Sequence, residues 1–437
     1  HVRLEPYTVV FKASDNGFPV NLVNFKTVFV KVIAPAPENF FAEPLGTGIN
    51  LSWEKSPCDN AIGYRIYRRS GSSGWDPSYC ETGVPGYTGF QLIDEVDDIN
   101  TLTYRDDNGG DGLVHGIDYC YRVTAFFYDD AESIASNEYC AYLKRDVPII
   151  TNVSNDSTNL ESGRCLIIWS KPIELDTIEY PGPYKYLLYR NDGLVWSNGG
   201  QFISSFNGLN DTIYLDSEIN LNTHDKPYSY RVEIENETVK PIGSSQKASS
   251  IFLNLQPSDK EIKLIWAPVV PWENEMTVIY RKDLGSSTYD SIGVSEFGFY
   301  RDKGLVNYQE YCYYVKTIGN YSLPGLIDPI INYSQLTCTA PVDNIPPCEP
   351  ILKVYTDCDQ ITNDIGMYLP YDSCSYDAVK FYVYFIPPGS ADSQLVDSVP
   401  YVPNDTTWYM HEDLSSVVGC YYVTARDSVG NISQASE

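Results

Sequence analysis

A segment of alternating apolar and polar positions, GIDYCYRVTAFFY at residues 116–128, carries the clearest structural signal in the chain. Tyr119, Tyr121 and Val123 share one side of it, which is the period of a β-strand with one buried face. Close variants return as YSYRVEI, YCYYVKT and GCYYVTA, at residues 228–234, 311–317 and 419–425. The pattern predicts an all-β protein that contains tandem copies of one small domain.

Each copy contains the same succession of strand signals. A strand that ends in an inward Trp comes first (NLSW, CLIIW, KLIW), and a Tyr-rich strand follows it (YRIYRR, YLLYR, VIYRK). In the fourth copy, GMYL places Leu369 where the others have Trp. We predict the last two strands of one domain at 1–33, followed by four repeats, the fourth without its final strand, at 34–145, 146–249, 250–342 and 343–437.

Composition supports many short strands and restricts the partners. The 437 residues suit four small domains plus a fragment. The net charge of −28 argues against nucleic acid as a partner, because a polyanion would be repelled. No apolar run approaches the ~20 residues of a transmembrane helix. The start HVRLEPYTVV, without Met, predicts a processed chain or an internal piece of a longer protein.

Eleven cysteines point to an exported protein whose domains are held by disulfides. Cys120 and Cys140 lie in neighbouring predicted strands, and Cys312 and Cys338 repeat that arrangement, so we predict a disulfide in each pair. Cys165 has the parity of an inward Trp and is expected to be a buried free thiol. The sequence lacks the C-x-x-C spacing of a metal cluster.

The succession of L-x-W, Y-x-I/L-Y-R, D-x-x-L and Y-x-Y-x-V-x-A resembles that of fibronectin type III domains, which are immunoglobulin-like β-sandwiches. The resemblance implies a two-sheet core filled by the Trp and the inner Tyr. It also places Tyr119, Tyr228 and Tyr311 as tyrosine-corner residues, while Gly419 takes that place in the fourth repeat. The turn ASDNGFP at 13–19 resembles that of cadherin-like sandwiches.

The cysteines of the fourth repeat allow more than one pairing. In a sandwich the start of the first strand lies near the end of the second, which favours a Cys348–Cys374 disulfide. Cys358 and Cys420 then pair with each other, or Cys420 has a partner beyond the end of the sequence, by analogy with the first repeat.

A narrower resemblance covers nearly the whole chain. The stretches CETGVPGYTGFQLI, YRDDNGGDGLVHGIDYCYRVTAFF, KPIELDTIEYPGPYKYLLYR and VDNIPPCEP with GCYYVTARDSVGNIS are similar to large surface proteins of Bacteroidota. Those proteins end in a gliding-motility-associated (type B) sorting domain and leave through the type IX secretion system. The resemblance implies a secreted or cell-surface protein whose partner is the secretion machinery of the outer membrane. The sorting domain itself is absent, so the route of export is inferred from the repeats.

Asp-Ser/Thr followed by a small or aliphatic residue resembles the O-glycosylation signal of exported proteins in that phylum. Chance occurrence is the alternative in a chain rich in Asp, Ser and Thr. The candidate sites are Thr177, Thr212, Ser291, Ser398, Thr406 and Ser428.

Candidate catalytic chemistry is sparse. Only four histidines exist, and no set of Ser, His and Asp or of Cys and His can be assembled from them, so we expect no enzyme and no organic cofactor. The best ion candidate is the acidic turn with Asp106, Asp107 and Asp111, whose oxygen ligands would suit calcium, although the spacing is not that of an EF-hand. An ordinary solvated turn is the alternative.

The first repeat carries a long insertion at 70–90, and Cys58 and Cys80 flank its base, so we predict a disulfide that ties it down. Trp75, Tyr79 and Tyr87 within it are candidates for stacking on sugar rings or for burial in a protein partner. The alternative is that the insertion packs on its own sheet.

These observations favour a non-catalytic stalk: a rod of sandwiches, with short Pro-marked linkers, that holds a distal region away from the membrane. Two alternatives remain. The repeats are themselves an adhesin for surface glycans or proteins, or they are auxiliary domains of a large secreted polysaccharide-degrading enzyme.

Overall fold

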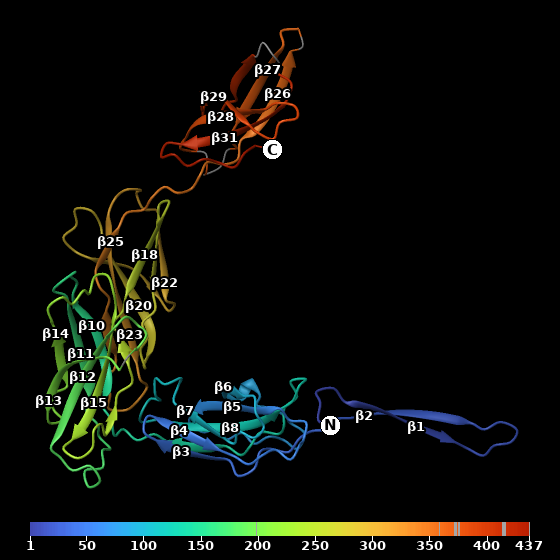
Figure 1. Ribbon diagram of the computed structural model, residues 1–437, viewed down its shortest axis with the longest axis vertical. Helices are drawn as coiled ribbons and strands as arrows, with labels where there is room; N and C mark the ends of the chain where they lie inside the picture. The colour runs from blue at the N-terminus through green and yellow to red at the C-terminus, as the bar shows by residue number, and fades with distance from the viewer. Residues whose placement is uncertain (198, 358, 371–373, 375, 413–416, 437) are drawn as a thin grey trace.

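Short strands pair into small antiparallel sheets throughout the described chain (Figure 1). The computed structural model describes residues 1–197, 199–357, 359–370, 374, 376–412 and 417–436. Within that part of the chain, each of four successive segments forms two sheets that enclose an apolar core, and one hairpin precedes them.

The hairpin consists of β1 (Tyr7–Ser14) and β2 (Val23–Val30), paired from end to end. Its apolar side chains, including Phe11, Phe25 and Phe29, are exposed. Because a two-stranded hairpin is at best marginally stable alone, it presents an apolar surface that is uncovered in the described chain.

The first sandwich shows how the sequence pattern builds a core. Trp53 packs edge-on against Tyr64, with ring centroids 5.2 Å apart, and both are buried between the sheets. One sheet has the order β3-β4-β7 and the other β6-β5-β8-β9. A 3₁₀ turn, η1 (Gly86–Thr88), lies in the insertion. The strands are β3 (Phe41–Leu45), β4 (Gly48–Ser52), β5 (Gly63–Ser70), β6 (Gln91–Val96), β7 (Thr103–Asp106), β8 (Asp118–Phe126) and β9 (Tyr139–Tyr142).

The second sandwich repeats this order as β10-β11-β14 and β13-β12-β15-β16, with β17 also pairing with β15. In β15 the burial alternates strictly from Tyr230 to Asn236, as its sequence requires. The strands are β10 (Ile149–Ser157), β11 (Arg164–Ser170), β12 (Tyr184–Asp192), β13 (Gln201–Asn207), β14 (Ile213–Asp216), β15 (Tyr228–Asn236), β16 (Gly243–Ser244) and β17 (Ala248–Ser249).

The third sandwich has the order β18-β19-β22 and β21-β20-β23-β24, with β25 also pairing with β23. Its strands are β18 (Leu253–Ser258), β19 (Glu261–Trp266), β20 (Glu273–Lys282), β21 (Asp290–Ser295), β22 (Phe299–Lys303), β23 (Tyr311–Asn320), β24 (Ile330–Tyr333) and β25 (Thr337–Thr339).

The fourth sandwich has β26-β27-β30 and β29-β28-β31. Its strands are β26 (Ile351–Asp357), β27 (Thr362–Tyr368), β28 (Ala378–Ile386), β29 (Gln394–Pro400), β30 (Thr407–Glu412) and β31 (Cys420–Asp427). In all four, the first, second and fifth strands form one sheet and the fourth, third and sixth the other. This is the fibronectin type III arrangement, so the predicted all-β class of tandem immunoglobulin-like sandwiches is confirmed.

The tyrosine corners also form as expected. The hydroxyl of Tyr119 accepts the backbone N–H of Val114 at 2.9 Å, and Tyr228 and Tyr311 make the matching bonds in the second and third sandwiches. In the fourth sandwich, Tyr421 donates instead to the carbonyl of Val417 at 3.2 Å.

The sandwiches do not form the straight rod that the linkers suggested. Figure 1 shows the first sandwich lying across the base of the second, the third beside the second, and the fourth at the far end. The edge strand β10 runs along β24, and polar side chains join them: Asn152 donates to the carbonyl of Ile331 at 2.8 Å, and Asn332 accepts the N–H of Val153 at 3.0 Å. Unpaired strand edges are natural places for such contacts.

A loop at 321–326 of the third sandwich completes this packing. The Tyr321 hydroxyl donates to the carbonyl of Ile150 at 2.6 Å, and its ring joins the core of the second sandwich. Arg145 donates to the carbonyl of Pro324 at 2.7 Å and lies against Gly116 of the first sandwich. A Cβ at Gly116 would come within 2.7 Å of the Arg145 side chain, and its φ of +94° also favours glycine. The first three sandwiches thus meet at one junction.

Candidate functional site

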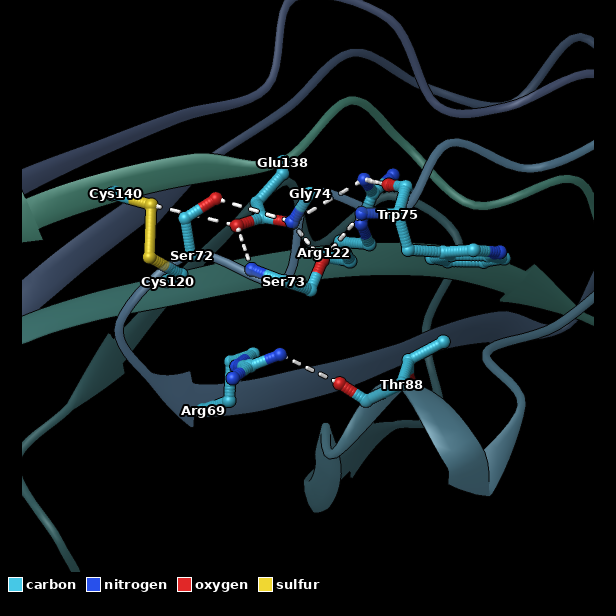
Figure 2. The surroundings of a disulfide bond; sticks show 10 residues. All are labelled: Arg69, Ser72, Ser73, Gly74, Trp75, Thr88, Cys120, Arg122, Glu138 and Cys140. Carbon is cyan, nitrogen blue, oxygen red and sulfur yellow. Dashed lines mark hydrogen bonds and ion pairs between the residues drawn. A yellow bond between two sulfur atoms is a disulfide. The ribbon is translucent and has the colours of Figure 1, made fainter.

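The insertion of the first sandwich, between β5 and β6, is held by a buried charge (Figure 2). Arg122 projects from β8, and its side chain is only 1% exposed. Its guanidinium donates to the carbonyl of Trp75 and, at 2.6 Å, to that of Ser136, and it lies 4.7 Å from the centre of the Trp75 ring. Burial lowers the pKa of Arg122, against the opposing effect of Glu138.

Glu138 provides a second attachment beside the Cys120–Cys140 disulfide (Figure 2). Its carboxylate accepts the N–H of Ser73 at 2.8 Å and the Ser73 hydroxyl. Burial alone would raise the pKa of Glu138, but the serine hydrogen bonds and Arg122 outweigh it and lower the pKa. The insertion is therefore fastened through its backbone to β8 and to the segment just before β9.

The predicted Cys58–Cys80 disulfide is wrong, because both cysteines are free in the structure. Cys58 is half-buried beside the core, whereas Cys80 lies exposed in the insertion. At the far end of the insertion, Arg69 donates to the carbonyl of Thr88 at 2.8 Å. Hydrogen bonds to Arg69, Arg122 and Glu138 thus fasten the insertion in place of the predicted disulfide.

The three aromatic candidates of the insertion differ in burial. Trp75 is half-buried under Arg122, so it packs the insertion onto its own sheet. Tyr79 and Tyr87 are 91% and 76% exposed. Tyr87 donates to Glu81 at 2.8 Å. Two of the three side chains are thus available to a partner.

The acidic turn does not gather its carboxylates around one point. Asp106 is buried, accepts two hydrogen bonds from Arg68 at 2.9 and 3.0 Å, and accepts the Tyr121 hydroxyl at 2.8 Å. Asp107 accepts the N–H of Gly110 at 2.9 Å, and Asp111 pairs with Lys247 of the second sandwich at 2.5 Å. Asp106 and Asp111 are thus occupied by ion pairs, which argues against calcium at this turn.

Asp106 belongs to a triad that recurs at the same place in three sandwiches. An Arg on the third strand and a Tyr on the sixth both contact an Asp at the end of the fifth. The hydroxyl-to-carboxylate distance is 2.8 Å in each case. Burial and the neighbouring carboxylate raise the pKa of each tyrosine, so all stay neutral donors. The triads are Arg68–Asp106–Tyr121, Arg190–Asp216–Tyr230 and Arg281–Asp302–Tyr313.

The fourth sandwich replaces the charged pair of this triad. His411 stands in the Asp position, with Nδ1 2.7 Å from the Tyr421 hydroxyl. Phe385 stands in the Arg position and packs against His411, with ring centroids 5.2 Å apart. Sequence reasoning did not identify the triad, although the joint change of Arg and Asp between the third and fourth repeats is a signal that could have found it.

The other cysteines divide into bonded and free. The structure contains the Cys120–Cys140, Cys312–Cys338 and Cys348–Cys374 disulfides. Cys165 is a fully buried free thiol, and burial raises its pKa to about 12. Cys420 is free and exposed, and Cys358 lies outside the described residues.

The six O-glycosylation candidates all lie at the surface. Two sit on the edge strands β21 and β29, and the others sit in loops or turns beside strands. Thr212 and Thr406 are half-buried, whereas Thr177, Ser291, Ser398 and Ser428 are exposed. Their modification stays a prediction.

Asp343, Asp377 and Asp427 form a carboxylate cluster that the sequence did not indicate, where the third and fourth sandwiches join. One oxygen of each lies within 4.8 Å of the other two. Burial, together with a hydrogen bond to and repulsion from Asp343, raises the pKa of Asp377 to about 6. Asp427 is buried and accepts three backbone N–H groups of the turn that follows β31.

The sequence and the structure were compared with known proteins. No protein-family model matches the sequence, and no curated protein matches it. Among solved structures, the FN1–FN3 domains of chicken CNTN1 match 71% of this chain and all of theirs, at 13% identity and a TM-score of 0.20. None of the described residues forms a helix that is long and apolar enough to cross a membrane. The strand order of the four sandwiches, rather than this match, makes the chain a series of fibronectin type III-like sandwiches. Its disulfides indicate an extracellular or surface setting.

Proposed function

We propose that this chain is a non-catalytic spacer in a secreted or cell-surface bacterial protein, one that leaves through the type IX secretion system and serves adhesion or gliding motility. The observation that carries the proposal is that charged side chains are used to hold the structure together. In the first three sandwiches, ion pairs and hydrogen bonds of buried or half-buried Arg side chains, three of them with a buried Asp, hold strands or the insertion together. A spacer needs such shape-keeping contacts, because its output is a fixed separation between the regions at its two ends.

Export is supported by the disulfides and by the surface. Cys120–Cys140 and Cys312–Cys338 cross-link neighbouring strands, and such bonds persist in oxidising surroundings. The charge of −28 keeps an extracellular chain soluble. The Asp-Ser/Thr sites lie where a glycosyltransferase could reach them.

Mass spectrometry of the natively purified protein, without reduction, tests the proposal. We expect added glycan mass at the Asp-Ser/Thr sites, paired cysteines, and peptides that continue from this chain into a sorting domain. An unmodified protein with free thiols throughout would contradict export and with it the spacer role.

The exposed tyrosines of the insertion favour a second function, in which the first sandwich is an adhesin for a glycan or a protein. Tyr79 and Tyr87 stand out from a loop whose base is fixed by Arg122. Retention of cells on the immobilised chain would be compared with retention on its Tyr79→Ser/Tyr87→Ser variant. Equal retention by both would rule this function out and leave the spacer.

A further inference from the structure

The side-by-side packing of the second and third sandwiches creates a groove of about 1050 Å³. One wall is the outer face of β10 and β11, and the other is formed by β23, β24 and β25. Its volume lies just above the usual range of about 300–1,000 Å³ for ligand clefts, which occur preferentially at domain interfaces. We propose that this groove binds a neutral oligosaccharide.

The first wall carries apolar residues where a sandwich normally faces water. Leu166 and Ile168 alternate with the buried Cys165, Ile167 and Trp169, so they point away from the core of their own sandwich. The equivalent outward positions of the first sandwich are polar, Asn50 and Ser52. Core packing does not require apolar side chains at Leu166 and Ile168, so both are available for contact with a ligand.

The opposite wall is aromatic. Tyr314 and Tyr333 line the groove, and their ring centroids are 6.2 Å apart. Behind them, Tyr280 stacks on Tyr314 at 4.7 Å with nearly parallel rings, which fixes the Tyr314 ring. One face of a pyranose ring is apolar, because its C–H groups point that way, and such a face stacks on a fixed aromatic ring.

The polar groups of the groove match hydroxyls rather than charges. Among its described lining residues there are two carboxylates, Asp156 and Glu310, one histidine, His224, which lies 2.6 Å from a carboxylate oxygen of Asp225, and no Lys or Arg. Carboxylates accept hydrogen bonds from sugar hydroxyls and repel phosphates and acidic sugars.

Charge also argues against a basic peptide. Asp156 already pairs with Arg164 at 2.9 Å, so Glu310 is the only lining carboxylate without an ion pair among the described residues. A single unpaired carboxylate among lining side chains that are otherwise mostly uncharged favours a neutral ligand over a cationic one.

Hydrogen bonds across the joint hold the two walls at a fixed separation. Ser154 accepts the N–H of Tyr333 at 3.0 Å, and Thr158 accepts the N–H of Leu336 at 2.8 Å. A preformed cleft loses less entropy on binding. The groove involves neither the route of export nor the insertion. Its test is therefore independent of the test of the proposed function.

The test is titration calorimetry of the whole chain with neutral oligosaccharides of different linkages, selected from a glycan array. Tyr314→Ala is expected to weaken binding about tenfold or more, since it removes the stacking platform. Glu310→Gln, at an exposed position that tolerates the change, is expected to weaken binding a few-fold because it loses a charged acceptor. Tyr422→Ala is the matched control: Tyr422 is the counterpart of Tyr314 in the fourth sandwich, where it stacks on Tyr384.

Loss of binding in Tyr314→Ala with retention in Tyr422→Ala supports the site. The proposal is overturned if no neutral oligosaccharide binds at millimolar concentration, or if both tyrosine variants bind alike. It is also overturned if an oligolysine peptide binds in the groove, in a manner abolished by Glu310→Gln, while the sugars do not. The Tyr79→Ser/Tyr87→Ser variant should bind the oligosaccharide normally, and loss of binding there would place the site on the insertion instead.

Discussion

Asp216 is fully buried, yet its carboxyl group lies between a guanidinium and a phenol. Replacing it with Ala would leave Arg190 buried without its main partner, which typically costs 3–5 kcal/mol. We therefore expect Asp216→Ala to lower the free energy of unfolding of the second sandwich by about 3 kcal/mol in urea titrations.

Glu218 provides the control for Asp216. It also pairs with Arg190, at 3.1 Å, but its side chain is 37% exposed. Glu218→Ala should cost less than about 1 kcal/mol, because solvent screens the pair. An equal decrease in the free energy of unfolding in the two variants would show that the buried triad stabilises the sandwich no more than an exposed ion pair does.

Asp377 makes stability depend on pH. Its pKa of about 6 in the folded chain lies above the ordinary value of about 3.9. The folded state therefore holds this proton more tightly, and stability falls as pH rises from about 4 through 6. In urea titrations with a chelator present, Asp377→Asn should raise the free energy of unfolding at pH 7.5 by about 1 kcal/mol, after allowance for solvent screening. Below pH 4 the gain should vanish, and a loss of stability at pH 7.5 would contradict the repulsion.

Two free thiols should differ sharply in reactivity. Cys80 is exposed, whereas Cys165 is fully buried with a pKa of about 12. Alkylation of the native chain by iodoacetamide should therefore label Cys80 within minutes and leave Cys165 unlabelled until urea is added. Peptide mass spectrometry distinguishes the outcomes, and an unlabelled Cys80 would point back to a disulfide with Cys58.

At the scale of elements, the insertion depends on one side chain of a neighbouring strand. Arg122→Met should free the carbonyl of Trp75 and loosen residues 71–90, so chymotrypsin, which cleaves after aromatic residues, should cut there at least about tenfold faster. Arg231→Met is the matched control, since Arg231 occupies the same position in β15 and faces Tyr189. Equal resistance of the two variants would mean that Glu138 suffices as an anchor.

The elements themselves were largely predictable, and the contacts between distant elements were not. Alternation placed Tyr121, Val123 and Trp169 inward, and all three are buried. The role of Asp106 could not be read from its turn, because Arg68 is 38 residues away and meets it only once the two sheets face each other. The Cys58–Cys80 error has the same origin: both lie near the insertion in sequence, but backbone hydrogen bonds fasten it elsewhere.

For the whole molecule, the central feature is the junction of the first three sandwiches. Tyr321→Ala removes both the hydroxyl bond to Ile150 and the ring that packs against Trp272. We expect it to broaden the distribution of distances between spin labels on the first and third sandwiches. As a control, a Gly-Ser insertion after Asn344, in the segment between β25 and β26, should change distances to the fourth sandwich alone. An unchanged distribution in Tyr321→Ala would mean that the β10–β24 contacts hold the joint without the loop.

The junction also bears on how such a chain can change in evolution. Tandem domains are commonly treated as interchangeable units that can be duplicated, deleted or reordered without harm to their neighbours. Here the loop at 321–326 fits a carbonyl of the second sandwich and the surface beside Gly116 of the first, so the third sandwich is specific to its place. Deleting or moving any one of the three would expose apolar surface on the others. We therefore expect length variation among relatives of this chain to fall before the first sandwich or after the third, and the three to be inherited as a block.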